Sequence, residues 1–105
     1  MENSGVKEIQ PKEVLNYVSE DPKVRNIIDV REYEEVEQGK IPVANHIPLG
    51  ELENRLHEID KEKEHILVCR SGNRSGMAAR FLKSRGYKVK NMVGGMLEWK
   101  DEIEK

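Results

Sequence analysis

The segment from Cys69 to Ser75 holds the residue types best suited to chemistry in this chain of 105 residues. A polar loop between a strand and a helix turns backbone N–H groups inward, and the helix aims its positive dipole end at the same point. Gly72 and Asn73 tolerate the left-handed backbone angles that such a loop needs. The segment therefore predicts an anion cradle. Its predicted substrate-binding residues are Arg70, Ser71, Gly72, Asn73, Arg74 and Ser75.

Cys69 itself is predicted to be the catalytic nucleophile. The thiolate is the reactive form of cysteine, and neighbouring cations and helix N-termini favour it. The alternative is a buried cysteine at a strand end that packs as a small apolar side chain, which is the commoner fate of a free cysteine. The polar loop and its two arginines favour the reactive interpretation.

Strands and helices must alternate to position this loop. Short apolar or β-branched runs predict strands at residues 26–30, 44–47, 65–69 and 87–93. Helical spacing and stop signals predict helices at residues 11–21, 51–59, 75–85 and 96–103, and a short helix or turn at 31–38. This order predicts an α/β fold with an open parallel sheet and helices on both faces. Ligands of such sheets bind beyond the carboxyl ends of strands, where Cys69 stands.

Composition narrows the class of protein. A chain of 105 residues predicts one domain, with residues 1–5 as a flexible N-terminal tail. The 18 basic and 20 acidic side chains give a net charge of -2, which disfavours a nucleic-acid partner. One cysteine excludes an intramolecular disulfide. The polar N-terminus and the lack of a long apolar stretch predict a cytoplasmic protein with no membrane partner.

The motifs, taken in order, resemble those of the rhodanese family, sulfurtransferases that carry sulfur as a cysteine persulfide. The resemblance extends from Ile9 to about Trp99. The segments that carry it are Asp29 to Tyr33, Gly39-Lys40-Ile41, His46-Ile47-Pro48, Cys69 to Ser75, Gly86-Tyr87, Gly94-Gly95-Met96 and Trp99. Two positions depart from the pattern: Lys40 replaces a usual histidine, and Val43-Ala44-Asn45 replaces a Gly-Ala pair. We expect a packing adjustment there.

The resemblance implies a single rhodanese-like domain with a parallel sheet of about five strands. It implies that Cys69 carries the persulfide, and that Asp29 and Arg31 form a structural ion pair near the loop. Cys69 would attack the outer sulfur of thiosulfate or a similar small anionic donor, and sulfite would leave. A thiol or a protein would then accept the sulfur. Because the chain has no second cysteine, that acceptor must be another molecule. No cofactor is implied beyond the persulfide intermediate.

Two alternatives to a thiosulfate sulfurtransferase stay open. One is a persulfide carrier or sulfur-relay module with little thiosulfate activity. The other is an oxyanion-processing phosphatase or arsenate reductase. Enzymes of that kind with a similar fold keep a histidine before the cysteine and an arginine six positions after it, whereas here Val68 precedes Cys69 and Arg74 follows five positions on. The smaller pocket suits a single transferred sulfur.

Other polar residues have simpler interpretations. His46, His57 and His65 lack the spacing of metal ligands, so no metal site is predicted. Trp99 is predicted to anchor the last helix by packing, with a substrate wall formed with Met96 as the alternative.

Overall fold

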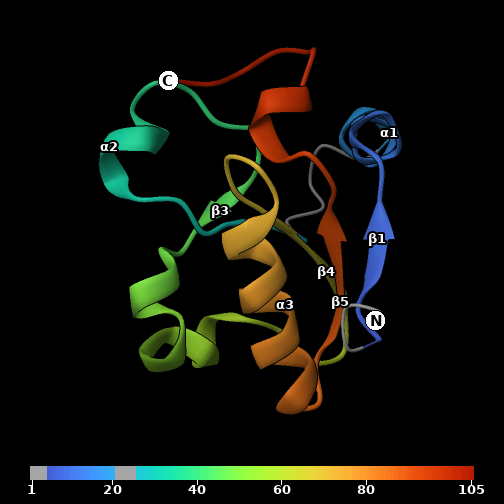
Figure 1. Ribbon diagram of the computed structural model, residues 1–105, viewed down its shortest axis with the longest axis vertical. Coiled ribbons are helices and arrows are strands. Elements are labelled where there is room, and N and C mark those ends of the chain that lie inside the picture. The colour runs from blue at the N-terminus through green and yellow to red at the C-terminus, as the bar shows by residue number, and fades with distance from the viewer. Residues whose placement is uncertain (1–4, 21–25) are drawn as a thin grey trace.

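The computed structural model describes residues 5–20 and 26–105 and forms one five-stranded parallel sheet (Figure 1). Its strand order is β1-β5-β4-β2-β3. The strands are β1 (Lys7–Ile9), β2 (Ile27–Asp29), β3 (Asn45–His46), β4 (Glu64–Val68) and β5 (Lys88–Met92). The helices are α1 (Pro11–Glu20), α2 (Tyr33–Val36) and α3 (Asn73–Ser84), with 3-10 helices η1 (Leu49–Glu51), η2 (Glu53–Glu58) and η3 (Gly95–Glu98). The predicted α/β class and sheet are confirmed.

Apolar side chains cover both faces of the sheet, because successive residues of a strand point to opposite sides. Along β4, Leu67 belongs to the core beneath α3, η1 and η2, whereas Ile66 and Val68 belong to the core beneath α1. Figure 1 shows α3 lying across one face of the sheet and α1 at the arrowhead end of β1. Strand β4 is therefore packed on both faces, and the candidate site begins at its carboxyl end.

The C-terminal segment differs from the sequence prediction. We predicted a helix at residues 96–103, but only the short η3 forms, and the backbone of Trp99 is extended. The Trp99 indole N–H donates to the carbonyl of Glu102 at 2.9 Å, and Glu104 pairs antiparallel with Lys40. The first contact lies within the segment and the second joins its end to Lys40, so these backbone groups are paired without a helix.

Two other elements were predicted imperfectly. In place of the predicted helix at 51–59 the chain forms η1 and η2. Within η2 the backbone departs from helical geometry at Arg55, which has φ −118°. Strand β1 was missed because Lys7 and Glu8 are exposed and only Ile9 is buried, which leaves no apolar run to detect. The predicted helix end near Asp21-Pro22 and residues 1–4 of the predicted tail lie outside the described residues.

The two departures from the family pattern lie in one turn. The Lys40 ammonium donates to the Ala44 carbonyl at 3.0 Å and lies 3.4 Å from the Glu104 carboxylate. Val43 has φ 67°, a left-handed conformation that a β-branched residue rarely adopts. Across residues 5–20 and 26–105, every helix is too short or too polar to cross a membrane.

Candidate active site

Cys69 lies directly after β4, at the carboxyl edge of the sheet, and its side chain is fully buried. The chain turns sharply at Gly72, whose φ of 104° is a conformation that favours glycine, and α3 begins at the next residue. Strand, turn and helix therefore bring the first turn of α3 over the sulfur. The structure places the candidate nucleophile at the N-terminal end of a 12-residue helix.

Hydrogen-bond donors surround the sulfur of Cys69. The Gly72 backbone N–H donates to Sγ at 3.0 Å, and the Ser75 hydroxyl lies 3.3 Å from it. Burial raises the pKa of the Cys69 thiol, but hydrogen bonds from the Ser75 hydroxyl and from the N–H groups of Ser75, Gly72 and Ser71 outweigh it. The pKa of Cys69 is therefore lowered below its usual value, and the arrangement stabilises a thiolate.

Asn91 is a site residue that sequence reasoning missed. It lies in β5, is 8% exposed, and its Oδ1 accepts a 2.5 Å hydrogen bond from the Ser75 hydroxyl. Its Nδ2 donates to the carbonyl of Gly72 at 3.2 Å. One amide thus positions both a hydroxyl and a turn that contact the sulfur. The available signal was a polar residue in a predicted strand, but β5 also holds Lys88 and Lys90, so the sequence alone does not distinguish a site residue from an ordinary polar one.

The segment that follows Gly94-Gly95 locks the cysteine loop in place through backbone hydrogen bonds. The backbone N–H of Met96 donates to the carbonyl of Cys69 at 2.8 Å, and that of Leu97 to the carbonyl of Arg70 at 3.0 Å. Gly95 has φ 59°, and a Cβ there would stand closer than 3.0 Å to both carbonyl oxygens. Only glycine permits this close approach. Trp99 packs in the core beneath α1.

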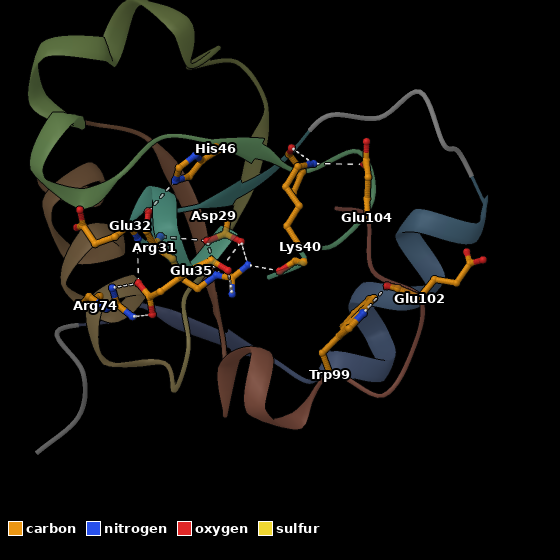
Figure 2. Close-up of polar contacts among 12 residues, drawn as sticks. Asp29, Arg31, Glu32, Glu35, Lys40, His46, Arg74, Trp99, Glu102 and Glu104 are labelled. Atoms are coloured by element: carbon orange, nitrogen blue, oxygen red, sulfur yellow. Dashed lines mark hydrogen bonds and ion pairs between the residues drawn. The ribbon is translucent and has the colours of Figure 1, made fainter. Parts of the chain in front are cut away.

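The two arginines of the loop have different surroundings. Arg74 forms two parallel hydrogen bonds with Glu35 of α2, at 2.6 Å and 2.8 Å (Figure 2). Arg70 is exposed, and no ion pair to it exists among the residues that the structure describes. Ser71 and Asn73 are exposed beside it. Sequence reasoning treated both arginines as free to bind an anion, but the guanidinium of Arg74 is already occupied.

The buried ion pair beneath the site involves Asp29 and Arg31. Arg31 Nε and Nη2 donate to the Asp29 carboxylate at 2.8 to 3.1 Å, and Nη2 also donates to the carbonyl of Gly39 at 2.7 Å. Its Nη1 lies 3.4 Å from the backbone carbonyl of Glu35. These side chains hold α2 in place, and none of the hydrogen bonds joins them to Cys69.

The histidines have ordinary partners. A ring nitrogen of His46 lies 2.7 Å from the Arg31 carbonyl, and one of His65 lies 2.7 Å from the Asp60 carbonyl. His57 is exposed beside Glu58. The described part of the chain brings together no cluster of histidine, cysteine and acidic side chains able to hold a metal ion.

Known proteins are similar to this chain in sequence and fold. A family model described as "Rhodanese-like domain" matches residues 10–102. The chain is 39% identical over 99 residues to "Putative sulfurtransferase YtwF" of Bacillus subtilis, covering 94% of this chain and 95% of that protein. It is 44% identical over 102 residues to "Putative sulfur carrier protein YrkF" of the same organism, covering 96% of this chain but only 55% of that longer protein.

A solved structure agrees with the sequence matches. The crystal structure of a rhodanese-like domain protein from Staphylococcus aureus superposes with a TM-score of 0.87 at 35% identity, covering 94% of this chain and 97% of that one. Its fold and the family match over residues 10–102 confirm the resemblance drawn from the motifs. The chain belongs to the family of rhodanese-like domains.

Proposed function

We propose that this protein is a sulfurtransferase that carries sulfane sulfur as a persulfide on Cys69. The observation that carries the proposal is the set of donors directed at Sγ, from the N–H of Gly72 and the hydroxyl of Ser75. These donors lower the pKa of Cys69 and so favour the nucleophilic thiolate. The names of two relatives, a sulfurtransferase and a sulfur carrier, support the same chemistry.

The reaction is a double displacement. The Cys69 thiolate attacks the sulfane sulfur of the donor, a new S–S bond forms, and the donor's own bond to that sulfur breaks. The electron pair of the broken bond leaves on sulfite when the donor is thiosulfate, or on a thiolate when the donor is a persulfide. The thiolate of an acceptor then attacks the outer sulfur of the Cys69 persulfide and regenerates the Cys69 thiolate.

The protein contributes charge stabilisation in both steps. Negative charge lies on Sγ before attack and on the terminal sulfur of the persulfide afterwards. The N–H of Gly72 and the N-terminal end of α3 stabilise this charge. Because Cys69 is fully buried, the loop must open to admit a donor, and this favours small or extended donors. Because the sequence has no second cysteine, the acceptor is a separate thiol or protein.

The sulfur donor is either thiosulfate or a persulfide. The motifs favour thiosulfate, and the sulfur-relay alternative favours a persulfide supplied by a thiol or another protein. One observation favours the second: Arg74, the cation beside the cradle, is already paired with Glu35.

A transfer assay tests the proposal. Purified protein is mixed with thiosulfate or with glutathione persulfide, cyanide is added as acceptor, and thiocyanate is measured. We expect Cys69-dependent thiocyanate formation that Cys69→Ser abolishes. Turnover of an aryl phosphate ester by the wild type, without any thiocyanate from either donor, would instead support the oxyanion-processing alternative.

A further inference from the structure

We propose that Glu35 sets the donor class of this site: by neutralising Arg74 it disfavours dianionic donors such as thiosulfate relative to thiol persulfides. The inference rests on the proposed function, because it concerns which donor supplies sulfur to Cys69. Its physical basis, a carboxylate that neutralises Arg74 of the cysteine loop, can be measured without any sulfur transfer.

The pairing occupies the two terminal nitrogens of Arg74, which would otherwise be available to bind an anion. Both carboxylate oxygens of Glu35 accept from the terminal nitrogens of Arg74, at 2.6 Å and 2.8 Å. This two-point geometry is the one by which arginine recognises carboxylates and other planar or tetrahedral anions. A sulfonate-like group of thiosulfate would have to displace Glu35 to make the same contacts.

Glu35 is held in place from several directions, unlike an ordinary surface carboxylate. Its Oε1 also accepts the backbone N–H of Glu32 at 2.9 Å, within the capping box of α2. Its backbone carbonyl lies against Arg31, which is itself fixed by Asp29. Only 27% of the Glu35 side chain and 31% of the Arg74 side chain are exposed. Figure 2 shows this chain of contacts running from Asp29 to Arg74.

The charge of a sulfur donor determines how strongly Glu35 repels it. The energy of a charge in a field grows with that charge, so a group of charge −1 beside the site repels thiosulfate, with charge −2, about twice as strongly as a singly charged reagent. The reacting end of a thiol persulfide carries at most one negative charge and no sulfonate. Glu35 therefore penalises thiosulfate selectively and leaves persulfides comparatively well tolerated.

A purely mechanical role for the pair is the competing explanation. In that case Glu35 only ties α2 to the cysteine loop, and its removal would change the reactivity of Cys69 toward all reagents in proportion. The two explanations predict different values for one ratio. This is the rate at which an anionic reagent alkylates Cys69, divided by the rate for a neutral reagent of the same shape.

The test compares alkylation of Cys69 by iodoacetate, which is anionic, with alkylation by iodoacetamide, which is neutral. Their rate ratio cancels changes in thiolate population and in loop opening. We expect Glu35→Gln to raise the iodoacetate-to-iodoacetamide ratio by roughly fivefold, as loss of one nearby charge predicts. Glu34→Gln is the matched control, since Glu34 is exposed on the same helix and outside the pair, and it should leave the ratio nearly unchanged.

Arg74→Gln gives a second, opposite expectation. It leaves Glu35 uncompensated, so the ratio should fall by a similar factor even if Glu35→Gln proves too unstable to study. For sulfur donors, whose reacting groups also differ by one charge, Glu35→Gln should raise kcat/KM for thiosulfate relative to glutathione persulfide by a similar factor, roughly fivefold.

The results separate this inference from the proposed function. An alkylation ratio that does not change in Glu35→Gln or Arg74→Gln, or that changes equally in Glu34→Gln, overturns the role of Glu35. A ratio that changes as expected in a protein that accepts sulfur from neither donor supports the charge balance at the site and contradicts the sulfurtransferase proposal instead.

Discussion

Replacing Ser75 by alanine should weaken the thiolate of Cys69. The Ser75 hydroxyl is buried, lies 3.3 Å from Sγ, and lowers the pKa of this thiol by hydrogen bonding to it. Ser75 has a single hydroxyl hydrogen, which Asn91 also accepts at 2.5 Å. The hydrogen therefore stabilises the thiolate only when it turns from Asn91 toward the sulfur.

The size of the effect follows from this competition. A hydrogen bond to a charged group contributes about 1.5 to 3 kcal/mol, and sharing the hydrogen places Ser75 at the lower end. About 1.4 kcal/mol corresponds to a tenfold change in the ratio of thiolate to thiol. We therefore expect Ser75→Ala to slow alkylation of Cys69 roughly tenfold at pH values below the pKa.

The assay is the pH dependence of alkylation by iodoacetamide. In Ser75→Ala the profile should move to higher pH, because the pKa of Cys69 rises when a donor to its charged form is lost. Ser71→Ala is the matched control, since Ser71 contributes through its backbone N–H and its side chain is exposed. An unmoved profile in a folded Ser75→Ala protein, or an equal movement in Ser71→Ala, would refute the reasoning.

Four further substitutions test other contacts. Asn91→Asp should also move the alkylation profile to higher pH, because a carboxylate would hold the Ser75 hydrogen and add negative charge near Cys69; a lower pH midpoint would contradict this role. The Arg74 hydrogen bond lowers the pKa of Glu35 from 4.5 to about 2 against the opposing effect of burial, so the pair stabilises the fold above pH 4.5 and this stabilisation is lost as pH falls toward 2. After screening by solvent we expect about 1 kcal/mol, visible in urea unfolding as a pH dependence that Glu35→Gln removes. Gly95→Ala should cost at least about 2 kcal/mol of unfolding free energy and slow Cys69 alkylation or sulfur uptake, because its left-handed backbone and the nearby carbonyls exclude a Cβ; wild-type stability would argue against the locked loop. Val43→Gly should raise the thermal midpoint by a few degrees, since relief of the left-handed strain at φ 67° exceeds the added backbone entropy by up to about 1 kcal/mol; a lower midpoint would be the contrary result.

The elements nearest the cysteine were predictable because each has a strong local pattern. The run from Ile66 to Val68 is apolar and is buried in β4, and the glycine and asparagine of the loop mark the turn into α3. Strand β1 has no such pattern, since its pairing with β5 connects residues over 80 positions apart in the chain. The C-terminal segment follows helical spacing, but Glu104 at its end pairs with Lys40, 64 positions earlier, and this contact leaves no local trace in the sequence.

The same distinction holds for the site. The position of Cys69 and its backbone donors follow from one contiguous segment, whereas Glu35 lies 39 positions before Arg74 and Asn91 lies 16 positions after Ser75. The acidic run around Glu35 resembles an ordinary solvated face in sequence. Only the fold shows that Glu35 forms an ion pair with Arg74 of the loop and so changes the charge of the site.

Sulfur uptake by the intact protein tests the central claim most directly. The protein is incubated with glutathione persulfide, and separately with thiosulfate, then freed of donor and measured by mass spectrometry with the modified peptide mapped. The persulfide mechanism predicts a gain of one sulfur atom on Cys69, lost on addition of cyanide or a thiol and absent in Cys69→Ser. A wild-type protein that is folded, alkylates at Cys69 and gains no sulfur from either donor would contradict it.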